Sequence, residues 1–120
     1  MTAPRFPRRV YDHGEEPDPR FTLANERNFL AWMRTSLALL AGGVALEALT
    51  PPIHPVLRLT ASTLLLVLAL AVPASAWWGW STTERALRQG QALPASGATT
   101  LLAIGVGIVA TVLLLGITLR

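Results

Sequence analysis

Arginine side chains recur every seven residues near the start of the chain, at Arg20, Arg27 and Arg34. Positions seven apart lie on one face of a helix, so this spacing predicts a stripe of guanidinium groups. A guanidinium carries a permanent charge and fixed N–H donors that suit carboxylates and phosphates. Because rings of arginine favour anions, we expect Arg20, Arg27 and Arg34 to bind an anion or to line a path for one.

Alanine and glycine form further stripes beside these arginines and predict close packing of helices. Lipid does not drive helices together hydrophobically, so close approach in a membrane depends on small side chains. Such packing can join the helices of one chain, or it can join copies of the chain into an oligomer, and both interpretations stay open. The residues expected to pack in this way are Ala24, Ala31, Ala38, Gly42, Ala45 and Gly107.

Acidic side chains stand where they can neutralise some of the remaining arginines. Glu47 and Arg58 flank a short turn, so they can pair across it or stay separately solvated. Glu26 shares the heptad phase of Glu47 and can pair with either Arg85 or Arg88. We therefore expect these residues to form structural ion pairs.

Other kinds of site have little support. The chain has no cysteine, so it has no disulfide and no thiolate metal site. Possible metal ligands lie between Asp12 and Glu16, but this segment belongs to a proline-rich tail that we expect to be mobile. The sequence shows no nucleophile–base pair, and the arginines of the tail alternate with acidic residues. We expect no enzyme activity, no cofactor, no metal site and no nucleic-acid partner.

Long apolar segments must hold these residues. The chain has 120 residues, of which 52% are hydrophobic and 14% are charged. A bilayer core of about 30 Å needs about 20 apolar residues in a helix, which residues 29–49, 59–78 and 99–119 provide. The fold class is therefore all-α, an integral membrane protein with three transmembrane helices. We expect a mobile polar tail over residues 1–18 and a membrane domain over residues 19–120.

Local signals set the ends of the helices. Asp18-Pro19 predicts a helix start, because Asp accepts from free backbone N–H groups and Pro suits the first helical position. Pro51-Pro52 ends this helix after Leu49. Gly90 predicts the end of the second helix, and Pro73 predicts a kink within it.

The distribution of arginine predicts the orientation of the chain. The positive-inside rule favours an inner N-terminus and an outer C-terminus, because few arginines then lie outside. In this orientation the outside receives Arg58 and Arg120, and the cytosol receives Arg5, Arg8, Arg9, Arg20, Arg27, Arg34, Arg85 and Arg88. The tryptophans near the inner ends of the first two spans form an aromatic belt at the same interface.

The segment from Leu23 to Trp32 resembles the signature of the small bacterial YidH-like membrane proteins, the domain-of-unknown-function family 202. That family is similar to the membrane domain of the vacuolar transporter chaperone, which makes and translocates polyphosphate. A second matching segment runs from Trp80 to Gly90. The resemblance implies that Arg27, and Arg20 before it, line the cytosolic side of a polyphosphate path; Arg34 has no secure counterpart. We expect no polyphosphate polymerase domain within these 120 residues.

These observations predict a multi-pass protein of the bacterial inner (plasma) membrane, with the lipid bilayer around it. We expect a homo-oligomer whose first helices surround an arginine-lined cytosolic vestibule for anions or polyphosphate. The alternative is a non-conducting scaffold, or an accessory subunit that packs against a larger membrane partner through its small-residue faces.

Overall fold

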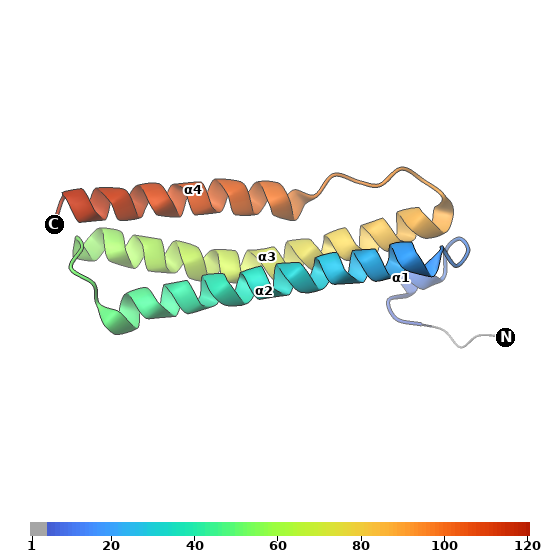
Figure 1. Ribbon diagram of the computed structural model, residues 1–120, viewed down its shortest axis with the longest axis horizontal. Coiled ribbons are helices and arrows are strands. Elements are labelled where there is room, and N and C mark those ends of the chain that lie inside the picture. Colours follow the sequence, from blue (N-terminus) through green and yellow to red (C-terminus); the bar gives the residue numbers. More distant parts are fainter. Residues whose placement is uncertain (1–4) are drawn as a thin grey trace.

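The computed structural model describes residues 5–120, and every regular element in this part of the chain is a helix (Figure 1). A short helix, α1 (Arg8–Tyr11), precedes three long ones, α2 (Pro19–Leu49), α3 (Pro55–Gln89) and α4 (Gly97–Thr118). All three long helices are long and apolar enough to cross a membrane. The prediction of an all-α chain with three candidate spans is confirmed.

The ends of the helices follow from the residues that flank them. Asp18 Oδ1 accepts a hydrogen bond of 2.9 Å from the Arg20 backbone N–H, and Pro19 is the first residue of α2, as expected. Thr50 ends α2 in a left-handed conformation before Pro51. Gly90 ends α3 with a φ of 66°, as its sequence position predicts.

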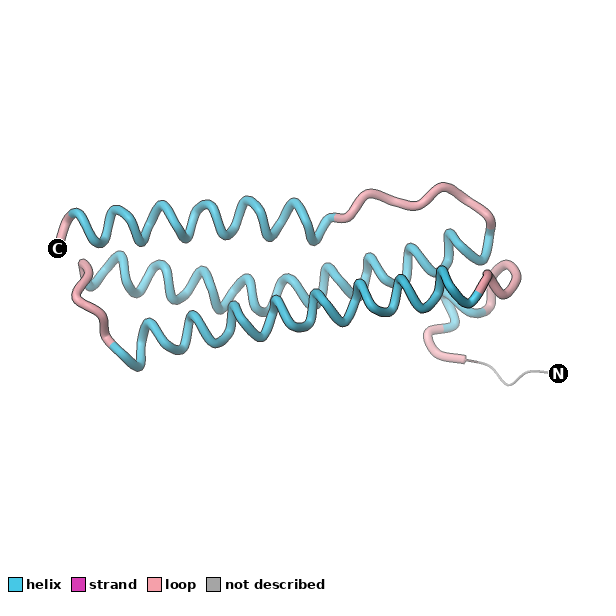
Figure 2. The backbone as a smooth tube through the Cα atoms, in the orientation of Figure 1, coloured by secondary structure: helices cyan, strands magenta, loops and turns pink. Residues whose placement is uncertain are grey.

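The long helices lie in a row with α3 in the middle. α3 contacts both α2 and α4, whereas α2 and α4 make no direct backbone approach to each other (Figure 2). The molecule measures 63 × 25 × 20 Å. The N-terminal segment and the C-terminus lie at opposite ends of it, as an odd number of crossings requires (Figure 1). Which end faces the cytosol stays a prediction.

Two glycines set how closely the helices approach. A Cβ on Gly43 would lie 2.9 Å from Leu66, so α2 and α3 come together at this point. A Cβ on Gly105 would collide with Leu68, which marks the approach of α4 to α3. The sequence stripe instead pointed to Gly42, whose Cβ would make only ordinary contact with Leu65. Gly107, also expected to pack, is exposed, and a Cβ there would meet nothing within 4 Å.

A hydroxyl on α2 replaces a backbone hydrogen bond that Pro73 removes from α3. Proline has no backbone N–H, so the carbonyl of Ala69, four residues earlier, lacks its usual partner within the helix. The buried Ser36 hydroxyl donates a hydrogen bond of 2.8 Å to this Ala69 carbonyl. A backbone carbonyl in a membrane interior needs such a partner because no water is available there. The bond therefore fixes α2 against α3 beside the proline.

The tail packs more closely than its composition suggests. Val10 of α1 is fully buried, and α1 lies against α3. The guanidinium of Arg88 donates to the carbonyls of Tyr11 and His13, at 3.1 and 2.8 Å. The expectation of a mobile tail over residues 1–18 therefore does not fit residues 5–18, because α3 buries Val10 and its Arg88 donates to carbonyls of the tail. Residues 1–4 lie outside the described part of the chain.

Candidate functional site

The arginine stripe of α2 lies on the face of this helix that α3 leaves uncovered. Arg20, Arg27 and Arg34 are all exposed. The buried residues of α2 are Asn25, Ser36, Leu39 and Gly43, and they recur at helical spacing on another face, which packs on α3. The structure thus places the three guanidinium groups on one outward-facing surface. We call the surface formed by Arg20, Arg27 and Arg34 the arginine face.

The members of the arginine face differ in their partners. Arg20 binds the Asp18 carboxylate, with 2.8 Å between Nη2 and Oδ2. The hydrogen bonds from the side chain and the backbone N–H of Arg20 lower the pKa of the Asp18 carboxyl. The ionised carboxylate of Asp18 therefore offsets the charge of Arg20. Arg27 and Arg34 form no ion pair and no hydrogen bond with any residue that the structure describes. Their charges are therefore available to a ligand or to another chain.

Small side chains surround the arginine face. Ala24, Ala31 and Ala38 are exposed, so they do not contribute to the packing of α2 on α3. Gly42 and Ala45 are half-buried nearer the α2–α3 turn. The alanine stripe therefore forms, with the arginines, an outer surface of α2 that another helix can approach closely.

The structure brings together one of the expected ion pairs. Arg58 Nε lies 3.9 Å from Glu47 Oε1, across the turn between α2 and α3. The Glu26 carboxylate forms no ion pair within residues 5–120, and Arg85 forms none either.

The prediction that Glu26 can pair with Arg88 is wrong. Arg88 instead binds Glu16 of the tail, with 2.8 Å between Nη1 and Oε1. Arg88 is buried beneath the tail, whereas Glu26 lies on the exposed surface of α2. The guanidinium of Arg88 therefore pairs with the tail and not with Glu26.

A buried polar cluster joins α2 to α3 on the face of α2 that packs on α3. Glu84 is only 1% exposed, and Thr22 donates to its Oε2 at 3.4 Å. The Asn25 amide donates to Glu84 Oε1 at 3.4 Å and to the Trp80 carbonyl at 3.1 Å. Sequence reasoning missed this cluster. Its only signal was Asn25, a polar residue inside the segment from Leu23 to Trp32 that carries the family resemblance.

Aromatic rings gather beside this cluster. The Phe29 ring centroid lies 6.1 Å from that of Trp77 and 6.4 Å from that of Trp80. Trp78 lies under the guanidinium of Arg9, which also donates to Ser81 at 2.7 Å. Amphipathic rings of this kind are typical of a membrane–water interface, so this end of the bundle carries an interfacial belt.

The matched region of a known family covers both the arginine face and the polar cluster. A domain of unknown function (DUF202) matches residues 20–86, more than half of the chain. The chain belongs to the DUF202 family. This match includes α2 and most of α3, so Arg20, Arg27, Arg34, Asn25 and Glu84 all belong to the family's region.

Relatives agree with this assignment over most of their length. The inner membrane protein YidH of Escherichia coli K12 is 38% identical over 102 residues, which cover 84% of this chain and 89% of YidH. The uncharacterized protein Rv2272 of Mycobacterium tuberculosis H37Rv is 43% identical over 100 residues, which cover 82% of each chain. No solved structure matches. The likeness to YidH and the three membrane-spanning helices place this DUF202 protein in the inner membrane.

Proposed function

We propose that this DUF202 protein assembles into a homo-oligomer whose α2 helices surround a vestibule for anions. Arg20, Arg27 and Arg34 line that vestibule, and Arg27 and Arg34, which have no partner among the described residues, supply its positive field. The proposal is a non-catalytic one: the protein binds or passes an anion and does not transform it. The observation that carries it is the exposure of Arg27 and Arg34 without a partner among the described residues.

The depth of Arg34 gives the proposal its physical reason. Ser36 is level with Ala69, and Gly97 at the start of α4 lies beside Ser75. Arg34 therefore lies roughly one helical turn deeper than the start of the third span. A charge exposed to lipid at this depth is costly unless it reaches the headgroups or finds a wet or charged neighbour. An oligomer with α2 at its axis provides that neighbour as water and anions.

The alanine stripe makes such an assembly geometrically feasible. Ala24, Ala31 and Ala38 let α2 helices from separate copies approach closely on the same side as the arginines. Each arginine level then becomes a ring, and several positive charges near low-dielectric walls concentrate anions. The segment from Leu23 to Trp32 resembles the DUF202 signature, and the resemblance of that family to the membrane domain of the vacuolar transporter chaperone adds polyphosphate to the anions worth testing.

A scaffold or accessory subunit is the second candidate. The exposed alanines of α2 support it equally, because a different membrane protein can pack on the same surface. In that case an acidic side chain of the partner neutralises Arg27 or Arg34. The two proposals differ in whether copies of α2 contact each other.

Flux in liposomes tests the vestibule. The protein is reconstituted, and chloride, phosphate and polyphosphate movement is measured for the parent and for Arg27→Glu and Arg34→Ala. We expect about a tenfold loss of anion flux or binding in both variants, because the focused positive field is lost. Arg85→Ala is the control: Arg85 on α3 also forms no ion pair among residues 5–120, so the same charge is removed away from the arginine face.

Disulfide cross-linking tests the assembly separately. The chain has no cysteine, so Ala31→Cys and Ala38→Cys introduce the only thiols. We expect both to form dimers in membranes, whereas Ile104→Cys, on the exposed surface of α4, should not. Anion flux that is equal in Arg27→Glu and Arg85→Ala would contradict the proposed vestibule. The absence of both cross-linked dimers and anion flux would favour the scaffold, because a different membrane protein then covers this surface of α2.

A further inference from the structure

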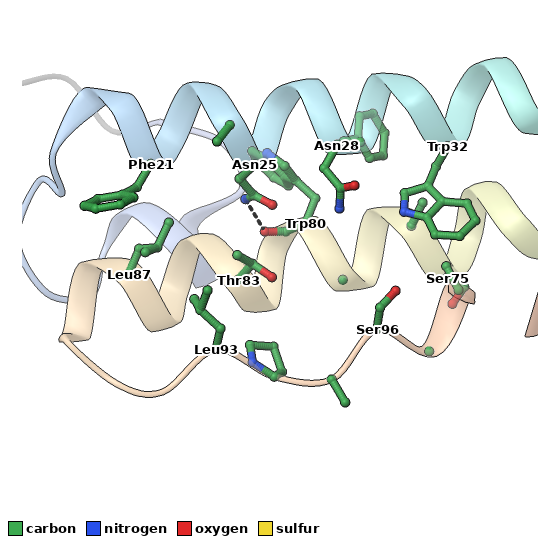
Figure 3. A pocket seen from close by; sticks show the side chains of 18 residues that line it. Phe21, Asn25, Asn28, Trp32, Ser75, Trp80, Thr83, Leu87, Leu93 and Ser96 are labelled. Atoms are coloured by element: carbon green, nitrogen blue, oxygen red, sulfur yellow. Dashed lines mark hydrogen bonds between the residues drawn. The ribbon is translucent and has the colours of Figure 1, made fainter. Parts of the chain in front are cut away.

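A cavity of about 350 Å³ lies where α4 begins (Figure 3). α4 starts at Gly97, whereas α2 and α3 both continue past this level toward the end that holds the tail (Figure 1). On the side of Gly97 that faces the tail, α4 does not continue beside α2 and α3, and the linker of residues 91–96 lies there instead. The cavity therefore follows from the short length of α4.

Polar and aromatic side chains from both helices line this cavity. Asn28 of α2 points toward α3, and Ser75 and Thr83 of α3 also reach the cavity (Figure 3). Trp32 and Trp80 form aromatic walls. The side chains of Asn28, Ser75 and Thr83 make no hydrogen bond with any described residue, so their donors and acceptors are free for a ligand.

The chemistry of the lining selects an uncharged ligand. None of the lining residues, all of which the structure describes, is ionisable. Burying a charge without a partner is costly, so the group inside should be neutral, with hydrogen-bonding atoms and apolar surface. The cavity lies at the start of α4, beside the aromatic belt, and therefore at the level of the membrane–water interface. Ester groups of bilayer lipids have this chemistry and occupy this level.

We propose that the cavity binds the glycerol-ester region of one bilayer lipid. The ester carbonyls accept from Asn28, Ser75 and Thr83, and the glycerol backbone packs against Trp32 and Trp80. The acyl chains leave toward the hydrocarbon, where they lie against apolar side chains of the bundle. This site is separate from the arginine face, since no arginine lines it.

Gly79 offers a way to close the cavity. Gly79 lines it, and a Cβ at this position would meet no atom within 4 Å. Leucine at position 79 can therefore occupy the space of the lipid without a clash at Cβ, and it also suits a helix better than glycine. Gly107 is the matched control, because a Cβ there also meets nothing within 4 Å and the residue lies outside the cavity.

Tryptophan fluorescence reports on the site. Trp77→Phe and Trp78→Phe together leave Trp32 and Trp80 as the emitting residues, and both line the cavity. A phosphatidylcholine with a nitroxide at carbon 5 of one acyl chain is titrated into this full-length variant in detergent. We expect quenching that saturates near one lipid per chain. A nitroxide at carbon 16 should quench less, because the ester region is the part that enters.

The glycine variants decide the proposal. In this background Gly79→Leu should weaken the saturable quenching about tenfold, whereas Gly107→Leu should leave it within about twofold of the parent. Quenching that never saturates, or that is equal in Gly79→Leu and Gly107→Leu, would overturn the proposal. If Gly79→Leu does not fold, as judged by circular dichroism, Asn28→Ala with Ser75→Ala replaces it. That pair should lose affinity, and an unchanged affinity would likewise overturn the site.

Discussion

Ser36 is the residue that makes Pro73 tolerable inside a membrane helix. Its hydroxyl donates to the Ala69 carbonyl, which the missing N–H of Pro73 leaves without a helical partner. Hydroxyl groups commonly turn back onto their own helix, as Thr111 does with Gly107 at 2.9 Å. Ser36 instead reaches a different helix, so its contribution depends on the proline.

A double-mutant cycle tests this dependence. Ser36→Ala should lower the free energy of unfolding by about 1 kcal/mol, because the Ala69 carbonyl loses its partner. In a Pro73→Ala background the new N–H satisfies that carbonyl, so the cost of Ser36→Ala should fall to about half or less. Unfolding in a denaturing detergent mixture measures both values. Thr111→Ala is the control and should change little; an equal cost of Ser36→Ala in both backgrounds would contradict this account.

At the scale of elements, the tail and α3 behave as one unit. The Glu15 backbone N–H donates to the Arg88 carbonyl at 2.9 Å, and Gly14 turns the chain there with a φ of 64°. Positive φ favours glycine. A Cβ on Gly14 would also clash with the Arg88 carbonyl oxygen. The turn at Gly14 therefore controls whether the tail lies on α3.

Gly14→Ala should release the tail from α3. The strain of a left-handed alanine costs about 1–2 kcal/mol, so we expect an approximately tenfold increase in tail opening. Hydrogen exchange of the Glu15 amide and trypsin cleavage after Arg8 and Arg9 measure this opening. Gly90→Ala is the matched control, since Gly90 has a φ of 66° but a Cβ there meets nothing within 4 Å. Equal protection of Glu15 in the parent and in Gly14→Ala would refute the proposed role of the turn.

At the scale of the whole molecule, the bundle is longer than the membrane is thick. The molecule is 63 Å long, and its longest helix, α3, has 35 residues and so spans about 52 Å at 1.5 Å per residue. Because the hydrocarbon core is about 30 Å thick, a large part of the bundle lies among headgroups or in water. α2 and α3 account for this excess, because both extend past the start of α4 (Figure 1). The projecting end carries the tail, the buried Glu84 cluster and most of the arginines.

The concentration of arginine at that end predicts that it faces the cytosol. We expect an impermeant thiol reagent to label Pro52→Cys, in the α2–α3 turn, in intact spheroplasts. Gln91→Cys, after α3, should react only once the membrane is opened. Because the chain has no cysteine, each variant carries a single thiol. Labelling of Gln91→Cys but not of Pro52→Cys in intact spheroplasts would reverse the orientation.

The sequence by itself determined the three long helices, both ends of α2 and the end of α3. Capping at Asp18, the break at Pro51 and the glycine end at Gly90 depend only on neighbours along the chain. The length of each apolar run likewise determined that three helices can cross a membrane.

Only the tertiary structure decided which faces meet. Within the membrane, these helices are apolar on all sides, so no apolar stripe indicates which face meets the partner helix. The sequence therefore pointed to Gly42 and Gly107, whereas the helices approach closely at Gly43 and Gly105. The contacts of Arg88 with Glu16 and of Ser36 with Ala69 join residues far apart in sequence. Such pairs depend on how helices rotate about their axes when they pack, and no local spacing specifies that rotation.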